Sequence, residues 1–213
     1  MLGKVAEAVL IRRCSEDLNI NREWLSIARR ITTRRSTAEA FCAIGTGLRS
    51  TKRHYPQKYN PSDPQRDIIW INKNGELATM QNAHYMAAIP AGLQVKVSGN
   101  GANYILKALK EQRYEVPMAY FPMQNDYESI FESVCKSERI EEGFLEGNFI
   151  NVRNVDDNAF IEVRNYFPIL VRLYTGELSA TEFVNEAIGI APIRNSILAG
   201  VLTSNATDIR IIR

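Results

Sequence analysis

Cysteine and histidine are scarce in this 213-residue chain, which holds three cysteines and two histidines. The cysteines, Cys14, Cys42 and Cys135, are far apart in the sequence and form no C-x-x-C pair. This spacing indicates neither a disulfide framework nor a structural zinc site. His54 and His84 are too few for most sets of zinc ligands, and they leave little scope for a Ser-His-Asp or Cys-His arrangement.

Long apolar runs are absent as well, since no apolar stretch approaches 18 residues and the N-terminus lacks the apolar stretch of a signal peptide. We therefore expect no membrane partner and a reducing, cytoplasmic location. The glycine-containing stretches "GTGLRS" and "GNGAN" fit neither the G-x-x-x-x-G-K-S/T pattern nor G-x-G-x-x-G after a strand, so no nucleotide cofactor is evident. The composition, 45% hydrophobic and 23% charged, is typical of a globular protein.

Charge is unevenly distributed along the chain. Residues 1–58 hold twelve Lys or Arg against five acids, a net charge of +7, and residues 124–162 hold ten acids against three bases, a net charge of −7. Such asymmetry suggests a face that meets a polyanion such as DNA. The alternative, two solvated faces that attract each other, explains the same distribution equally well.

The pattern of apolar residues predicts a single domain, 1–213, that begins with helices. Two helices are expected in the first 31 residues, the second capped by Asn21. A third helix is expected to begin at Ser36, with Glu39 completing an S-x-x-E capping box, and to end at Gly45 and Gly47.

Strands and helices then follow one another, which indicates a mixed α/β fold. After a proline-rich loop, the chain predicts strands in "DIIWIN", "ELATM", "LQVKVS" and "VPMAYFPM", with a helix in "NYILKALKEQRY" between the last two. Residues 123–213 predict helices in "NDYESIFESVCKSERI" and "SATEFVNEAIG", strands in "NFINV" and "FIEVRNYF", and a tail "DIRII".

One predicted strand, "GLQVKVS", carries two polar side chains on the same face. Side chains two apart in a strand point the same way, so Gln94 and Lys96 share one environment while Val95 and Val97 face the other side. A register shifted by one residue would bury the lysine, which a core does not tolerate. Asp67 begins an earlier strand that is expected to pair nearby.

This order resembles the PD-(D/E)xK nuclease superfamily, in the Q-x-K variant found in Mrr-like restriction nucleases. In that family a short sheet holds an acid on one strand and the Q-x-K element on its neighbour, followed by a helix and another strand. The resemblance covers about residues 36–122 and implies a restriction-endonuclease-like central mixed β-sheet flanked by helices. Residues 1–35 would add N-terminal helices, and residues 123–213 a C-terminal α/β extension.

The resemblance implies a nuclease that hydrolyses phosphodiester bonds in DNA with Mg²⁺, or alternatively Mn²⁺. Such hydrolysis uses a metal that polarises the phosphoryl oxygen and activates water, and Mg²⁺ accepts one or two protein carboxylates. Asp67 and Gln94 would supply metal ligands, and Lys96 would orient the attacking water or stabilise the developing negative charge. Glu39, on a helix before the Asp67 strand, is a further candidate ligand, although its place in the capping box with Ser36 is the favoured explanation.

The basic N-terminal part of the chain would contact the phosphates of DNA, with Arg34, Arg35, Arg49 and Arg53 as the expected contacts. A homodimer is expected because cutting both strands of a duplex takes two copies of a single-site enzyme. Restriction or another defence against foreign DNA is the setting that the resemblance implies. Two alternatives remain: a non-catalytic nucleic-acid-binding or assembly protein that retains the nuclease-like fold, and a soluble α/β interaction protein without a nucleic-acid role.

Overall fold

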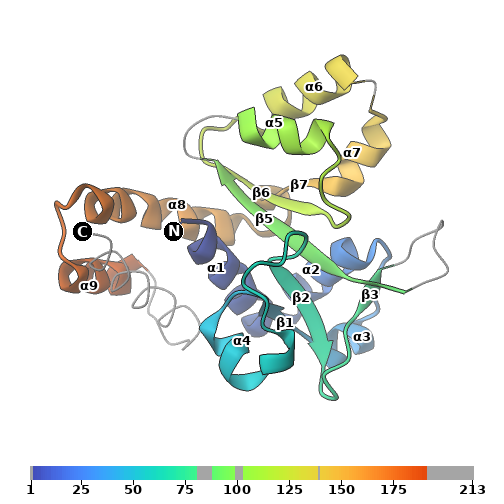
Figure 1. Ribbon diagram of the computed structural model, residues 1–213, viewed down its shortest axis with the longest axis horizontal. Coiled ribbons are helices and arrows are strands. Elements are labelled where there is room, and N and C mark those ends of the chain that lie inside the picture. Colours follow the sequence, from blue (N-terminus) through green and yellow to red (C-terminus); the bar gives the residue numbers. More distant parts are fainter. Residues whose placement is uncertain (1, 81–87, 99–102, 139, 191–213) are drawn as a thin grey trace.

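The computed structural model describes residues 2–80, 88–98, 103–138 and 140–190 (Figure 1). In chain order these residues form α1 (Leu2–Glu16), α2 (Leu18–Arg29), α3 (Arg35–Ala40), β1 (Phe41–Gly45), α4 (Arg49–His54), the 3₁₀ helix η1 (Pro56–Lys58), β2 (Ile68–Asn72), β3 (Thr79–Met80), β4 (Ile89–Pro90), β5 (Gly92–Ser98), α5 (Asn103–Lys110), β6 (Met118–Pro122), α6 (Tyr127–Glu138), α7 (Glu142–Asn148), β7 (Phe149–Asn151), α8 (Val152–Thr175) and α9 (Ala180–Ile190).

A mixed five-stranded sheet in the order β1-β2-β5-β6-β7 is the centre of the structure. β1 runs antiparallel to β2, and β2 antiparallel to β5, whereas β5, β6 and β7 are parallel neighbours. Parallel strands need a crossover connection, which α5 provides between β5 and β6. The mixed α/β architecture with a helix-flanked central sheet is therefore confirmed.

Both faces of this sheet are covered, and β6 shows how the chain divides between them. Ala119 and Phe121 belong to a large core shared with α1, α2, α8 and α9. Their neighbours Met118 and Tyr120 point the other way and pack with residues of α5, α6 and α7. Figure 1 shows these three helices gathered over one side of β6 and β7. Every residue of β6 is buried, as expected for a strand covered on both faces.

Helix α1 lies in the middle of the molecule, between the sheet and α8 (Figure 1). The seven residues from Val5 to Ile11 are all buried, none more than 4% exposed. A helix that is buried on every side has to be apolar on every side, and this stretch is apolar with one exception, Glu7. Packing of α1 therefore buries one acidic side chain, that of Glu7.

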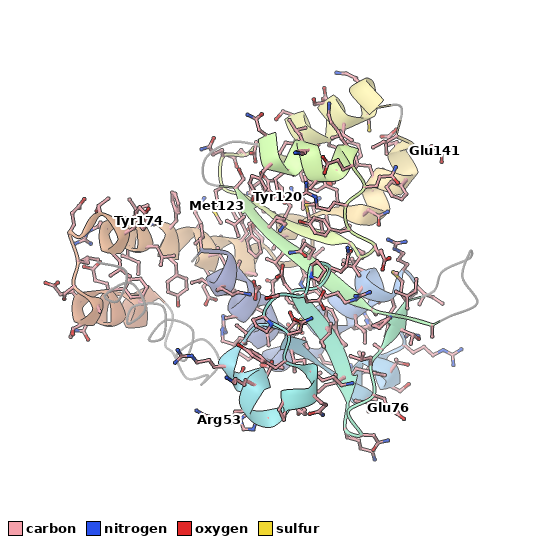
Figure 2. The ribbon with its side chains drawn as sticks, viewed as in Figure 1. Arg53, Glu76, Tyr120, Met123, Glu141 and Tyr174 are labelled. Atoms are coloured by element: carbon pink, nitrogen blue, oxygen red, sulfur yellow. The ribbon has the colours of Figure 1, made fainter. Side chains whose placement is uncertain are left out.

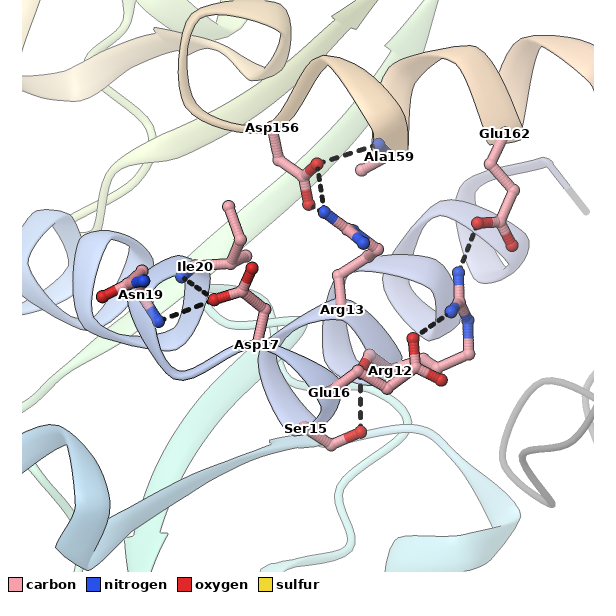
Figure 3. Close-up of polar contacts among 10 residues, drawn as sticks. All are labelled: Arg12, Arg13, Ser15, Glu16, Asp17, Asn19, Ile20, Asp156, Ala159 and Glu162. Carbon is pink, nitrogen blue, oxygen red and sulfur yellow. Dashed lines mark hydrogen bonds and ion pairs between the residues drawn. The ribbon is translucent and has the colours of Figure 1, made fainter.

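Two arginines of α1 fasten that helix to α8 (Figure 3). Arg13 makes a bidentate ion pair with the buried Asp156, through Nε to Oδ2 at 2.8 Å and Nη2 to Oδ1 at 3.0 Å. Asp156 has extended backbone angles that kink α8, and its Oδ1 accepts a hydrogen bond from the Ala159 N–H at 3.1 Å. Arg12 pairs with Glu162 one and a half turns further along α8. Basic and acidic segments of the sequence thus meet at this contact.

The helix predicted to run from Ser36 to Gly45 is wrong beyond Ala40, because Phe41–Gly45 form strand β1. This strand pairs with β2 residue by residue, from Phe41 opposite Asn72 to Gly45 opposite Ile68. Hydrogen bonds to a strand that lies 23 or more residues later in the chain override the local helical spacing.

The two predicted helix caps are also wrong. Asp17 caps α2, since its side chain accepts from the N–H groups of the next turn, while Asn21 lies inside the helix and is buried. The Asn21 amide accepts from Trp70 Nε1 at 2.8 Å and so joins α2 to β2. The capping box does not form, because Arg34 is the N-cap of α3 and makes no side-chain capping bond.

In the C-terminal part, the predicted helices α6 and α9 and the strand β7 are confirmed. The strand predicted in "FIEVRNYF" is wrong, because these residues belong to α8. Phe160, Val163 and Tyr166 are buried against the core at the three-residue spacing of a helix. The polar residues between them produce an alternating pattern in the sequence that resembles a strand. The tail "DIRII" lies outside the described residues.

Replacing Arg13 by methionine is expected to lower the free energy of unfolding by about 3 kcal/mol, because Asp156 would keep a buried charge without its partner. Urea unfolding at pH 7 measures this change. Arg35→Met is the matched control, since Arg35 pairs with Glu39 at 3.1 Å on the exposed surface; its removal is expected to cost less than about 1 kcal/mol. Equal losses in the two variants would contradict the anchoring role of Arg13.

Candidate active site

Asp67 and Gln94 meet where β2 and β5 begin to separate. The strands pair only at Ile68–Leu93 and Ile69–Gly92, and from Gln94 onwards β5 continues along β6 alone. Asp67 precedes β2 and therefore lies at this divergence. Its Oδ2 accepts a hydrogen bond from Gln94 Nε2 and another from the Val95 N–H, the latter at 2.8 Å. The structure thus brings together two residues that the sequence analysis selected.

Lys96 lies two residues beyond Gln94 on the same side of β5. Its charge lowers the pKa of Asp67, which means that the ammonium is within electrostatic range of that carboxylate. Lys96 Nζ also lies 5.1 Å from the centre of the Tyr114 ring, a cation–π contact. Tyr114, from the segment between α5 and β6, is a neighbour that sequence reasoning missed, because nothing in the local pattern links this segment to β5.

Glu7 of α1 is an acid within electrostatic range of Asp67 and Lys96, and sequence reasoning also missed it. The pKa of Glu7 is raised from 4.5 to about 7, chiefly by burial and next by the negative charge of Asp67. The charges of Lys4 and Lys96 oppose this rise. A signal for Glu7 does exist in the sequence, since it is the one acid inside the apolar run "VAEAVLI", and acids are rarely buried unless they are paired or functional.

Asp67 shares this partly buried environment. Burial raises the pKa of its carboxyl group, while the Val95 N–H and the charges of Lys4 and Lys96 oppose the rise. The carboxylate is held on one side by two hydrogen bonds to Oδ2, so its other oxygen, Oδ1, is the one that would bind a cation. The divergence of β2 and β5 therefore presents the Asp67 carboxylate with the Gln94 amide, and the charges of Glu7, Lys4 and Lys96 lie within electrostatic range of Asp67.

Glu39, the further candidate ligand, does not join this group. It precedes β1 at the end of the β1–β2 ladder where Phe41 faces Asn72, whereas Asp67 lies beyond the opposite end. Its exposed carboxylate pairs with Arg35 at 3.1 Å. Among the described residues, Glu7 is a helical acid within electrostatic range of Asp67.

The four arginines expected to contact DNA fall into two pairs at opposite ends of β1. Arg34 and Arg35 lie at the start of α3, before the strand. Arg49 and Arg53 lie on α4, after the strand (Figure 2 shows Arg53 at the surface there). The α4 pair is at the Asp67 end, because the Thr46 N–H donates to the Asp67 carbonyl at 2.9 Å.

The donor set fits a small, hard cation such as Mg²⁺. No group of three or more His, Cys, Asp or Glu side chains that could hold a metal occurs in the part of the chain that the structure describes. Mg²⁺ needs fewer, because it binds through one or two carboxylates and completes its shell with water and phosphate oxygens. Glu7, Asp67 and the amide oxygen of Gln94 are all oxygen donors, and burial penalises the charge of both acids, which a bound cation would neutralise.

Comparisons of this chain with protein-family models, with curated proteins and with solved structures find no match. Across the described ranges, no helix is both long enough and apolar enough to cross a membrane. Function has to be inferred from the arrangement of the site itself.

Glu7→Gln is expected to be more stable than the wild type at pH 8, by up to about 3 kcal/mol, and to lose that advantage below pH 5. The folded wild type holds a proton on Glu7 up to about pH 7, whereas the unfolded chain releases it near 4.5. Wild-type stability therefore falls as pH rises through this window, and the amide has no proton to lose. Urea unfolding at pH 4.5 and pH 8 measures the difference, with Glu23→Gln on the exposed side of α2 as control. A stability difference that is the same at both pH values would contradict the burial of this carboxylate.

Proposed function

We propose that this protein is a metal-dependent nuclease that hydrolyses phosphodiester bonds in DNA. The observation that carries the proposal is the contact of Asp67, which precedes β2, with Gln94 of β5 at the point where the two strands diverge, with the charges of Glu7 and Lys96 within electrostatic range. Two acids, an amide oxygen and an ammonium are the groups that metal-assisted phosphodiester hydrolysis needs.

The connection of the strands supports a restriction-endonuclease-like fold for this sheet. β1, β2 and β5 form an antiparallel series, and α5 then leads to the parallel strand β6. The acid precedes β2, and the Q-x-K element lies on its neighbour β5. This is the order of elements that the resemblance to the PD-(D/E)xK superfamily implies.

Glu7, Asp67 and the Gln94 amide oxygen would hold Mg²⁺ or Mn²⁺. Such an ion, when bound, polarises the phosphoryl oxygen and lowers the pKa of water. Gln94 and the Val95 N–H fix the orientation of the Asp67 carboxylate through their bonds to Oδ2.

Lys96 would stabilise the negative charge that develops on the phosphate or orient the attacking water. The Tyr114 ring restricts the positions that the Lys96 ammonium can take. A lysine held in advance loses less entropy when it acts, which favours a role in the transition state.

DNA would approach over α4, where Arg49 and Arg53 lie at the Asp67 end of β1. Contacts from such side chains bind phosphates and position the duplex without reading its sequence. A homodimer would bring two such sites to the two strands, and restriction or defence against foreign DNA is a setting that rests on family resemblance alone.

A non-catalytic nucleic-acid-binding or assembly protein is the second candidate, and one observation favours it. Gln94 occupies a place where an acid would add a negative charge, and its amide nitrogen already satisfies Asp67. A site with one charge fewer binds a divalent cation more weakly. The lysines and arginines of the site would then bind phosphates without cutting them.

Lys96→Ala is expected to slow Mg²⁺-dependent cleavage of supercoiled plasmid by at least about 100-fold, because it removes charge stabilisation of the transition state. The rate of conversion to nicked and linear DNA measures the effect. Lys73→Ala, in the exposed turn after β2, is the matched control and is expected to cleave at the wild-type rate. Cleavage at equal rates by the wild type and Lys96→Ala would rule out the proposed site, and retention of DNA without any cleavage would favour the second candidate.

The double variant Arg49→Gln/Arg53→Gln is expected to bind DNA more weakly than the wild type and to show a smaller dependence of affinity on salt. Each phosphate contact that is lost lowers the slope of log affinity against log salt concentration by about 1. Arg34→Gln/Arg35→Gln carries the same charge change at the far end of β1 and is expected to have the smaller effect. Fluorescence anisotropy with a labelled duplex at several salt concentrations compares the two double variants. An equal loss of DNA affinity in both would contradict the approach of DNA over α4.

A further inference from the structure

Lys4 is a second ammonium at the candidate active site, and the proposed reaction makes no use of it. It lies one turn before Glu7 on α1, and its Nζ donates to Glu7 Oε2 at 2.9 Å. The Lys4 side chain is 38% exposed, so the pair links a buried carboxylate to the rim of the site. The charge of Lys4 also lowers the pKa of Asp67. One ammonium therefore acts on both of the carboxylates that would hold a metal.

The position of the Lys4 ammonium depends on a glycine in the loop after β1. A Cβ atom added to Gly47 would lie 2.9 Å from Lys4 Nζ and 3.4 Å from the Cα of Pro61. The loop is itself fixed beside the site, because Thr46 bonds to the backbone of Asp67. Gly47 thus leaves the space in which the end of the Lys4 side chain lies.

Charges of both signs lie near the site, and Asp63 adds a further negative charge that acts on Asp67. Glu7 and Asp67 are two negative charges when ionised, and Lys4 and Lys96 are two positive ones. The two lysines are held differently: Lys96 lies against the Tyr114 ring, whereas Lys4 bonds directly to a candidate metal ligand. A divalent cation bound by both carboxylates would meet the Lys4 ammonium at Glu7, where two cations repel each other.

We propose that Lys4 is an internal counter-ion that occupies the Glu7 carboxylate in the metal-free protein and leaves it when a divalent cation binds. This inference rests on the metal site of the proposed function. Because binding of the ion includes breaking the Lys4–Glu7 pair, Lys4 lowers the affinity of the site for metal. Its removal strengthens binding, in contrast to the removal of a ligand.

Binding of Mn²⁺ alone, without nucleic acid, tests this inference. Isothermal titration at pH 8 compares the full-length wild type with Lys4→Met, and the variant is expected to bind Mn²⁺ about 10-fold more tightly, the equivalent of one charge-assisted hydrogen bond that no longer has to be broken. Lys73→Met, which removes an exposed lysine from the turn after β2, is expected to match the wild type. Glu7→Gln is expected to weaken binding, which locates the ion at this carboxylate.

Gly47→Ala provides an independent variant that leaves every charge in place. The added methyl group displaces the end of the Lys4 side chain, so this variant is expected to bind Mn²⁺ more tightly than the wild type, though by less than Lys4→Met. Thermal unfolding of each variant establishes that it is folded before titration.

The outcomes separate the inference from the proposed function. If the wild type binds Mn²⁺ and Lys4→Met binds it equally or more weakly, Lys4 is not a counter-ion to be displaced, and the metal site stands without it. If neither protein binds Mn²⁺, and Gly47→Ala does not bind it either, the metal site itself fails and the inference fails with it.

Discussion

The burial of one carboxylate, that of Glu7, is the constraint on which the arrangement of the site depends. α1 lies between the sheet and α8, so the side chains from Val5 to Ile11 are removed from water when the protein folds. An acid in that position has to be neutralised by a proton, a neighbouring cation or a bound metal ion. Lys4 bonds to Glu7 and the charge of Lys96 acts on it, and the raised pKa of Glu7 indicates that these two cations offset the cost of burial only in part.

The position of α1 is in turn fixed by α8, from the opposite end of the described chain. The bidentate pair of Arg13 with the buried Asp156 holds one end of α1 against the kink in α8, and Arg12 bonds to Glu162 along the same side. Glu7 is six residues from Arg13 on the same helix, so these contacts also set where its carboxylate lies. The charge asymmetry of the sequence therefore has a structural component, since some of its basic and acidic residues pair with each other.

The site combines features that suit catalysis and features that suit binding alone. Its lysines and the arginines of α4 favour a phosphate-containing ligand under either proposal. The difference lies in the metal, because two carboxylates, one amide oxygen and a competing ammonium make a site of modest charge. A divalent ion would bind there with help from phosphate oxygens, which couples metal binding to the presence of the nucleic acid in the nuclease that we propose.

The sequence by itself determined the local features of this protein: the two N-terminal helices, the strands β2, β5 and β6 with the helix between the last two, and the shared face of Gln94 and Lys96. These follow from side-chain periods of two and of about 3.6 residues, which adjacent residues record. Only the tertiary structure decided that Phe41–Gly45 is a strand, that "FIEVRNYF" is helical, and that Glu7 rather than Glu39 is the helical acid within electrostatic range of Asp67. Those outcomes depend on pairing and packing with residues far away along the chain, and no local period reports which distant segment will cover a given face.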